Sequence, residues 1–268
     1  MNRRAFLYTL TGASVTGALV ATAGADGEDT HDIEITRVPF HLGLRTPLRM
    51  VVLGDIHFDP VYDEAYLRQV IQLVNGLQPD ILAYTGDFVS HRLHRVPDLA
   101  DILASAQGRL STFSVTGNHE MWTNLVYIQK VLEQRSAIRI LRNASFALAG
   151  EADVYITGLD SFSAGFPRPN VLDQTPPNSR HIVFAHEPDS FDVLTNPRIR
   201  LQISGHTHGG QVRLPLYGAI VLPEWGRKYQ QGRYTKGARQ LYVNRGVGTF
   251  PLNLRINCRP EITVFELT

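Results

Sequence analysis

The sequence is poor in cysteine, has almost no net charge and contains no repeat of fixed period or low-complexity tract. Cys258 is its one cysteine, so no disulfide can form within the chain, and such a lone cysteine is more often buried than reactive. A formal net charge of +1 leaves no broad basic field, so we expect no nucleic acid among the partners. The 268 residues, 43% hydrophobic and 19% charged, indicate one large globular domain, with two domains as the alternative.

The first 25 residues differ in composition from the rest of the chain. Arg3 and Arg4 precede an uncharged run of small and apolar residues that ends in the sequence "AGA". This layout is typical of an export signal, and "NRRAFL" resembles the twin-arginine type. The alternative is a spanning helix that anchors the protein, although Gly, Ser and Thr make the run weakly hydrophobic. We expect a twin-arginine-type signal peptide at 1–25, cleaved or retained as a tether, and one folded domain at 26–268.

An export signal also sets the expected location and charge of the mature protein. Passage through the twin-arginine export machinery would place it in the periplasm or cell envelope, tethered to the membrane if the signal is retained. Loss of 1–25 removes two basic residues and no acidic ones, which leaves 24 basic against 25 acidic residues. A nearly neutral exported chain fits poorly with nuclease action on chromosomal DNA.

The rest of the chain alternates strand-like and helix-like segments before strands come to dominate. Buried strands are predicted at "LRMVVL" and "DILAYTGD", and helices at "DEAYLRQVIQLVNGLQPD", "VPDLADILASA" and "TNLVYIQKVLEQRSA". The first helix has one apolar face and should end near Gly76 and Pro79, and Thr123 is the expected N-cap of the third. Later strands are predicted at "RHIVFAHEP", "RIRLQISGH" and "EITVFELT". The pattern predicts an α/β fold with a sheet-rich second half.

Four of the predicted strands end in the same way. "VVLGDIH", "AYTGDFV", "SVTGNHE" and "QISGHTH" each run into Gly and then into a residue that can bind a metal. That residue is Asp55, Asp87, Asn118 or His206. Glycine lets the backbone turn tightly and lets an ion approach closely. Because sites in open α/β sheets form at the carboxyl ends of strands, we expect these four strand ends to converge.

Neighbouring positions add further residues of ligand type, namely His57, His119, Glu120, His186 and His208. His57 follows Asp55 by two positions, and the same spacing separates the two histidines of "GHTH". Side chains of an extended chain alternate between faces, so the members of each pair point the same way. Any one of these motifs is more often a turn or a satisfied polar residue. Five in one chain, all at strand ends, indicate a metal site.

The donor set also indicates how many metals to expect. Two carboxylates, one amide and four imidazoles, with His119 left out, exceed what one ion needs alongside water. A pair of ions about 3.5–4 Å apart that share one bridging carboxylate would use all of them. We expect two divalent metal ions, and these donors suit Mn, Fe, Zn or Co without choosing among them.

In order, the motifs read D-x-H, G-D, G-N-H-E, H and G-H-x-H between Val51 and His208, which closely resembles the calcineurin-like metallophosphoesterases. "GHTHGGQVRLP", "GRKYQQGRY" and "LYVNRGVGTF" are similar to an exported or membrane-associated bacterial branch of that family. The resemblance implies an α/β fold of the four-layer αββα sandwich type, with two central sheets and a dimetal site at their edge.

The resemblance also implies roles for individual residues. Seven would be metal ligands, divided between the first metal (Asp55, His57, His208), both metals (Asp87) and the second metal (Asn118, His186, His206). His119 would be the histidine beside the leaving group that binds no metal. Many relatives have Asp three residues after the bridging Asp, where this chain has Ser90. Glu120, Asp160 and a backbone carbonyl are therefore open alternatives for the group that orients His119.

The implied activity is hydrolysis of phosphodiester or pyrophosphate bonds by a hydroxide held between the two metals. His119 would donate a proton to the leaving oxygen as general acid, with a purely electrostatic role as the alternative. Phosphorylated small molecules or lipid head groups are the expected substrates. Arg245 and His91 are candidates for contacting them, and both also fit ordinary packing or solvated positions.

Two other functions remain open at this point. One is hydrolysis of lipid-linked or nucleotide-sugar pyrophosphates at a membrane face, which a retained tether and the aromatic and basic stretch "LPEWGRKYQQGRY" would favour. The other is a metal-binding protein without turnover. The complete ligand set and the intact His119 argue against this second alternative.

Overall fold

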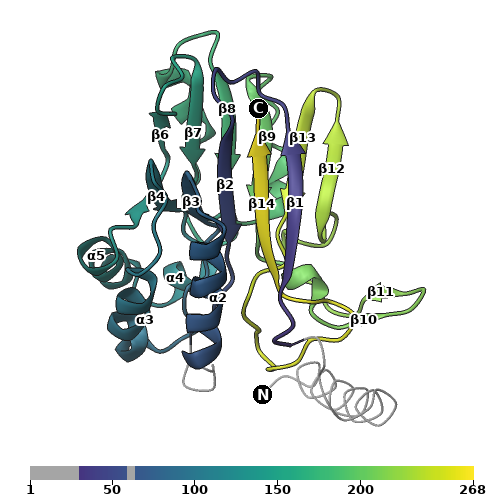
Figure 1. Cartoon of the computed structure of the whole chain (residues 1–268). Helices are drawn as coiled ribbons and strands as arrows, with labels where there is room; N and C mark the ends of the chain where they lie inside the picture. Colours follow the sequence, from purple (N-terminus) through teal and green to yellow (C-terminus); the bar gives the residue numbers. More distant parts are fainter. Residues whose placement is uncertain (1–29, 59–63) are drawn as a thin grey trace.

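The computed structural model describes residues 30–58 and 64–268, and the signal peptide expected at 1–25 lies outside these ranges. Two β-sheets form the centre of the described part (Figure 1). The first has the order β1 (Glu34–Phe40), β14 (Glu261–Leu267), β2 (Leu48–Leu53), β3 (Ile81–Tyr84), β4 (Ser111–Ser114), β5 (Arg139–Ile140). The second has the order β12 (Gly232–Lys236), β13 (Arg239–Val243), β9 (Ile199–Ser204), β8 (Arg180–Phe184), β7 (Val154–Gly158), β6 (Ala144–Ala147).

The strands that precede the candidate ligands are parallel within each sheet. In the first sheet β2, β3, β4 and β5 run parallel, with β14 antiparallel to β2 and parallel to β1. In the second sheet β7, β8, β9 and β13 run parallel, and the edge strands β6 and β12 are antiparallel. Parallel order brings the carboxyl ends of neighbouring strands to one edge of the sheet, where a site can form.

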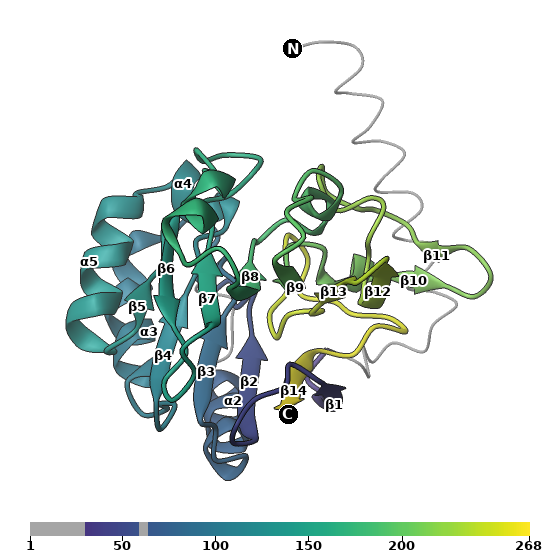
Figure 2. The same cartoon turned by 90° about the horizontal axis from the view of Figure 1, so that it is seen from above.

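Three helices cover the outer face of the first sheet: α2 (Glu64–Gly76), α3 (Val96–Leu103) and α5 (Leu125–Arg135) (Figure 2). The strand β2 is apolar at nearly every position because both of its faces are covered. Val51 and Leu53 pack toward these helices, whereas Met50 and Val52 belong to the core between the two sheets. The predicted apolar face of α2 is confirmed, since Val70 and Val74 are buried.

The layer outside the second sheet contains 3-10 turns in the described residues. η2 (Pro169–Gln174) supplies Leu172 and η3 (Pro188–Asp192) is followed by Leu194, and both side chains pack against Val183 of β8. The predicted α/β sandwich with two central sheets is thus confirmed, with short turns and loops as its fourth layer. Among the helices of these ranges, none combines the length and apolarity that crossing a membrane requires.

The start of α5 corrects one expectation. Asn124 is the N-cap, because its side-chain oxygen accepts a hydrogen bond from the Tyr127 amide at 3.1 Å. Thr123, the N-cap predicted from the sequence, instead donates its hydroxyl to the His119 carbonyl at 2.7 Å. That bond terminates the short helix α4 (Asn118–Trp122), which carries His119. Thr123 therefore caps the helix before it rather than the helix after it.

Candidate metal centre

The candidate ligands follow the carboxyl ends of five parallel strands from both sheets. Asp55, Asp87 and Asn118 come after β2, β3 and β4 of the first sheet, while His186 and His206 come after β8 and β9 of the second. All eight side chains of the implied site, His119 included, are buried. The structure therefore brings together every candidate ligand named from the sequence.

Five of these residues have a backbone conformation that L-residues rarely adopt. Among the residues of the implied site, φ lies between 49° and 71° at Asp55, His57, Asp87, His206 and His208. Left-handed φ values are uncommon outside glycine and cost free energy. Five such strained residues in one site indicate that the surrounding structure holds the backbone there in order to orient the ligand side chains, at a cost in local stability.

The glycines that precede the ligands make room for carboxylates. A Cβ atom at Gly117 would lie 2.1 Å from Asp87 Oδ1, and one at Gly205 would lie 2.3 Å from Asp55 Oδ2. Neither distance is compatible with any side chain unless the carboxylate moves. The Gly residues noticed at the strand ends are thus required by the packing of loops from neighbouring strands.

The ligand atoms form two groups. In the first, His57 Nε2 lies 3.1 Å from His208 Nε2, which in turn lies 4.0 Å from Asp55 Oδ1. In the second, His186 Nε2 lies 3.2 Å from Asn118 Oδ1 and 3.2 Å from His206 Nδ1. Donors that surround one ion at bonds of about 2.1 Å are separated by roughly 3 Å, so these spacings fit metal coordination.

Asp87 belongs to both groups. Its Oδ2 atom lies 3.1 Å from His186 Nε2 and 3.7 Å from His57 Nε2. The Asp87 carboxylate is therefore placed where a bridging ligand would be. Burial raises its pKa, but His186 and further neighbouring imidazoles outweigh burial and hold the pKa well below the usual value.

Two further observations show that the residues fit a metal. Asp55 Oδ2 is buried and has no hydrogen-bond partner, which is costly unless a ligand satisfies it. Burial lowers the pKa of His57 to about 3, so its imidazole is neutral at physiological pH, the form that binds metals. The neutral His57 imidazole and the unpartnered oxygen of Asp55 are donors of the kind that divalent cations take.

The far side of three of the four ligand imidazoles is held by a hydrogen bond, whereas His208 Nδ1 is buried without a hydrogen-bond partner among the described residues. His57 Nδ1 lies 3.1 Å from the Ser90 hydroxyl, and His186 Nδ1 lies 2.7 Å from the Thr85 carbonyl. His206 uses Nε2 for the Glu224 carbonyl at 2.7 Å, which leaves Nδ1 facing the cluster. Such bonds fix the orientation of a ring and leave its other nitrogen for a ligand.

His119 lies beside the cluster and is oriented by a backbone carbonyl. Its Nδ1 atom is 2.9 Å from the Ser90 carbonyl oxygen, which identifies the orienting group among the three alternatives. Glu120 instead accepts the backbone amides of Asp87 and Gly117, at 2.9 and 2.8 Å. Donor atoms of His57, Asp87 and His119 also lie within 4.8 Å of one another. Proximity alone therefore does not separate a ligand from a proton donor here.

Asp160, the remaining alternative for orienting His119, is bound to another residue. Its carboxylate receives two hydrogen bonds from Arg142, at 2.8 and 2.9 Å. Glu120 holds the loop after β3 against the start of α4, because it also accepts the Phe88 amide at 2.8 Å. Glu120 therefore positions the two ligand loops relative to each other.

Of the two candidate substrate residues, the structure places His91 at the site and turns the Arg245 side chain away. The Arg245 guanidinium pairs with Glu261 at 2.8 Å and with Glu34 at 2.9 Å, so the packing alternative holds for this residue. His91 is exposed, and its ring centroid lies 5.5 Å from that of His119.

Phe250 is a site residue that sequence reasoning missed. Its ring stacks on His57 with centroids 5.2 Å apart and meets the edge of His119 at 4.6 Å. Trp122 contacts His119 from another side at 5.1 Å and is 61% exposed. Apolar rings thus border the candidate general acid. No local pattern in "GVGTF" distinguishes this phenylalanine from a core residue.

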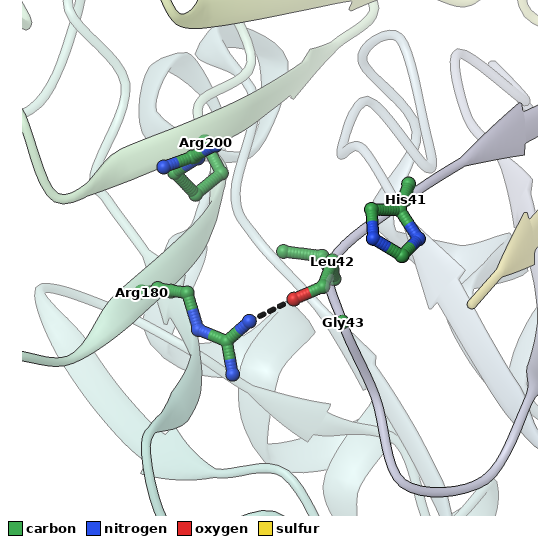
Figure 3. A pocket seen from close by; sticks show the side chains of 5 residues that line it. All are labelled: His41, Leu42, Gly43, Arg180 and Arg200. Atoms are coloured by element: carbon green, nitrogen blue, oxygen red, sulfur yellow. Dashed lines mark hydrogen bonds between the residues drawn. The ribbon is translucent and has the colours of Figure 1, made fainter.

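A pocket also lies far from these ligands, at the amino-terminal ends of β8 and β9. It has a volume of about 230 Å³ and is lined by His41, Leu42, Gly43, Arg180 and Arg200 (Figure 3). Arg180 donates to the Leu42 carbonyl and pairs with Asp153 at 2.8 Å. The charge of its guanidinium is therefore already neutralised. The candidate metal ligands lie at the opposite, carboxyl ends of β8 and β9.

Comparison with known proteins agrees with this geometry. The family model for calcineurin-like phosphoesterases matches residues 48–210, the span that contains every candidate ligand. The chain belongs to the calcineurin-like phosphoesterase family and is a metal-dependent hydrolase of phosphoric esters.

Several relatives match over most of the chain. It is 32% identical over 281 residues to the uncharacterized metallophosphoesterase YkuE of Bacillus subtilis, covering 100% of this chain and 98% of that protein. It is 29% identical over 235 residues to phosphodiesterase YaeI of Escherichia coli, covering 86% of each. It is 26% identical over 276 residues to UDP-2,3-diacylglucosamine pyrophosphatase LpxG of Chlamydia trachomatis, covering 82% of this chain and 83% of that protein.

Among solved structures, the chain resembles the NAD nucleotidase NadN of Haemophilus influenzae. The TM-score is 0.50 at 12% identity, over 75% of this chain and 46% of that one. At this identity the likeness bears on the fold alone.

Proposed function

We propose that this chain is a dimetal phosphoesterase that hydrolyses phosphodiester or pyrophosphate bonds. The observation that carries the proposal is the position of Asp87, whose Oδ2 atom lies within 3.7 Å of an imidazole nitrogen in each of the two ligand groups. Asp55, His57 and His208 would hold one ion with Asp87. Asn118, His186 and His206 would hold the other with the same carboxylate.

Bound divalent ions would supply charge neutralisation on phosphoryl oxygens and would lower the pKa of coordinated water toward neutrality. The side chains of the protein contribute orientation and a buried environment. His57 and His186 are each held by an outer hydrogen bond, so little reorganisation is needed when a ligand arrives. Phe250 and Trp122 place aromatic rings against the His119 imidazole.

His119 is the residue we propose for protonating the leaving oxygen. Its Nδ1 atom faces the Ser90 carbonyl, an acceptor, so Nδ1 carries the proton in the neutral ring. A second proton on Nε2 is then the one available for transfer to the substrate. The Ser90 carbonyl thus fixes which ring nitrogen faces away from the main chain.

The experiment that tests this function uses the purified chain stripped of metal. Hydrolysis of an aryl phosphodiester and of its monoester is followed with and without added Mn²⁺, together with the number of metals bound per chain. Asp87→Ala should lose metal-dependent turnover, whereas the exposed Asp153→Ala should retain it. Two bound metals with no turnover on either ester would contradict dimetal hydrolysis of simple esters.

A second candidate is the hydrolysis of lipid-linked or nucleotide-sugar pyrophosphates at a membrane face. It is favoured by the apolar rings of Phe250 and Trp122 beside His119, which suit a substrate with apolar parts. The pyrophosphatase named among the relatives acts on an acylated nucleotide sugar. Comparing an acylated UDP-sugar with the same UDP-sugar without acyl chains tests this. Equal kcat/KM for the two would contradict it.

The location is also a proposal. We infer export through the twin-arginine route to the periplasm or cell envelope from the paired Arg3 and Arg4 before an uncharged run. Replacing both with Lys should retain the protein in the cytoplasm, as cell fractionation would report. Unchanged export of the double variant would indicate another route.

A further inference from the structure

An uncharged segment projects from the body of the protein. The stretch 214–223, "LPLYGAIVLP", contains ten residues without a single charge. Its first half forms a hairpin from β10 (Arg213–Leu214) and β11 (Gly218–Ala219), which extends away from both sheets (Figures 1 and 2). A chain segment of this composition would ordinarily be buried, so its position outside the core requires an explanation.

Apolar side chains of this segment are almost completely exposed. Leu216 has an exposed fraction of 105%, Tyr217 of 87% and Val221 of 75%. Leu216 and Tyr217 lie in the turn between the two strands and are called the apolar tip, whereas Val221 follows β11 at the base of the hairpin. Scattered single exposed apolar residues are ordinary on a protein surface, but three within six positions of one segment form a patch of the kind that marks an interaction surface.

The hairpin is held rigidly at its base. The Arg213 amide donates to the Ile256 carbonyl at 3.0 Å, and the Ile220 amide donates to the Val212 carbonyl at 3.2 Å. The Arg213 guanidinium donates to the Gly209 carbonyl at 2.7 Å. These bonds fix the direction in which the tip points, so its exposure is a property of the fold.

The base of the hairpin adjoins the metal centre. Gly209 directly follows the candidate ligand His208, and the chain that leaves the hairpin returns to place the Glu224 carbonyl against His206. The Gln211 side chain bonds to the Leu252 carbonyl at 2.8 Å, and Leu252 is itself 50% exposed. Exposed apolar groups therefore occur both at the tip and on the loop whose Phe250 covers the site.

The amino-terminal part of the chain leaves the described fold at the same place. The Arg255 amide donates to the Thr30 hydroxyl at 3.0 Å, and Ile256, the next residue, pairs with Val212 beside the hairpin. Thr30 is the first described residue, and the 29 residues before it include the uncharged run up to position 25. Thr30 therefore lies on the side of the molecule that carries the hairpin.

We propose that the apolar tip inserts into the surface of a lipid bilayer and that it holds the metal centre close to that surface. The Leu216 side chain would enter the acyl boundary, and Tyr217 suits the interfacial layer. Arg213 before the run and Arg227 after it outnumber Glu224 among the charges nearest in sequence, which favours anionic lipid, while Lys228 is paired with Asp192. This surface is independent of the chemistry proposed above for the site.

A lipid surface fits this hairpin better than a second protein chain does. Stable protein interfaces bury about 800 Å² on each partner, with side chains from a broad area. The apolar side chains at the turn of one narrow hairpin fall far below that area, whereas insertion of a few such side chains is sufficient for reversible binding to membranes. A second copy of the chain is the alternative occupant that the experiment must separate.

The first test locates the tip directly in the full chain. Tyr217→Trp is mixed with vesicles of three parts phosphatidylglycerol to seven parts phosphatidylethanolamine, with or without bromine on the acyl chains. Its added fluorescence should shift to shorter wavelength and be quenched by the brominated lipid. Val126→Trp is the matched control, since Val126 is 77% exposed on α5. Quenching at neither position, or equally at both, would overturn the proposal.

The second test measures the contribution of the tip to binding. Leu216→Asp combined with Tyr217→Asp should reduce vesicle binding of the full chain about tenfold or more, whereas Val126→Asp should leave it unchanged. Turnover of a soluble aryl phosphodiester should be equal in all three proteins, which separates this proposal from the proposed catalysis. Unchanged vesicle binding by the double variant, or its conversion of an oligomer to a monomer, would assign the tip to another occupant and overturn the proposal.

Discussion

The ring nitrogen Nδ1 of His119 lies 2.9 Å from the main-chain oxygen of Ser90. The hydroxyl of the same serine lies 3.1 Å from Nδ1 of the candidate ligand His57. One residue thus orients two imidazoles through two different atoms. Because a main-chain oxygen is present whatever the side chain, orientation of His119 does not depend on the residue type at position 90, whereas orientation of His57 does.

Ser90→Ala should therefore weaken metal binding without removing the proposed general acid. Loss of the hydroxyl frees the outer nitrogen of His57, and such losses reduce metal affinity about 10- to 100-fold. Turnover at saturating metal should stay near that of the unchanged protein. Calorimetric titration of the metal-free chain and rates across a metal series measure the two effects. Unchanged metal affinity would show that the hydroxyl does not fix the His57 ring.

His119→Ala should keep both metals and lose turnover. General acid catalysis contributes about 10²- to 10⁴-fold, and the loss should be smallest for esters whose leaving groups need no proton. A series of aryl phosphodiesters with leaving groups of different pKa gives this dependence, and metal analysis of the same sample gives the occupancy. Loss of one metal would identify His119 as a ligand, in line with its closeness to His57 and Asp87.

Gly205→Ala should displace the Asp55 carboxylate. The new Cβ atom would lie 2.3 Å from Asp55 Oδ2, so the carboxylate must move and metal affinity should fall at least about tenfold. Gly76→Ala is the matched control, because no atom lies within 4 Å of a Cβ placed there, at the end of α2. Equal affinity in the two variants would show that Asp55 can bind from another position.

His181 should make the metal-free protein less stable in mild acid. Burial lowers the pKa of this histidine from 6.5 to about 4. Between pH 6.5 and pH 4, His181 is therefore protonated in the unfolded chain and neutral in the folded chain. The free energy of unfolding should therefore be highest above pH 6.5 and fall as the pH drops toward 4. Urea titrations from pH 7 to 4 should show a shallower fall for His181→Gln. An identical slope would contradict this assignment.

The ligand positions could be predicted from the sequence because they depend on local regularities. A strand, a Gly and a donor recur at four strand ends. Asp55 and His57 do lie together as predicted, but not through period-two alternation, because both follow β2 with left-handed φ values. Parallel strand order then brings these ends to one edge of a sheet. The apolar face of α2 was predictable for the same reason, since helical periodicity places Val70 and Val74 on one side.

The remaining parts depend on contacts between distant segments. Phe250 contacts His57 although it lies 193 residues later in the sequence. No short sequence pattern predicts a contact over that separation. Arg245 lies in a segment near the site, but its guanidinium forms ion pairs with Glu34 and Glu261 and so points away from the ligands. The group that orients His119 is a main-chain oxygen, whose direction depends on the exact path of the loop after β3.

The centre draws its donors from both sheets, with Asp55, Asp87 and Asn118 after strands of one and His186, His206 and His208 after strands of the other. Any ion held by Asp87 together with His186 would therefore join the two halves of the sandwich. Binding adds its own free energy to that of unfolding, so the sheets would separate less readily in the loaded protein. With Cys258 as its one cysteine, this chain has no disulfide to provide such a cross-link, and the coordination bonds would take that place.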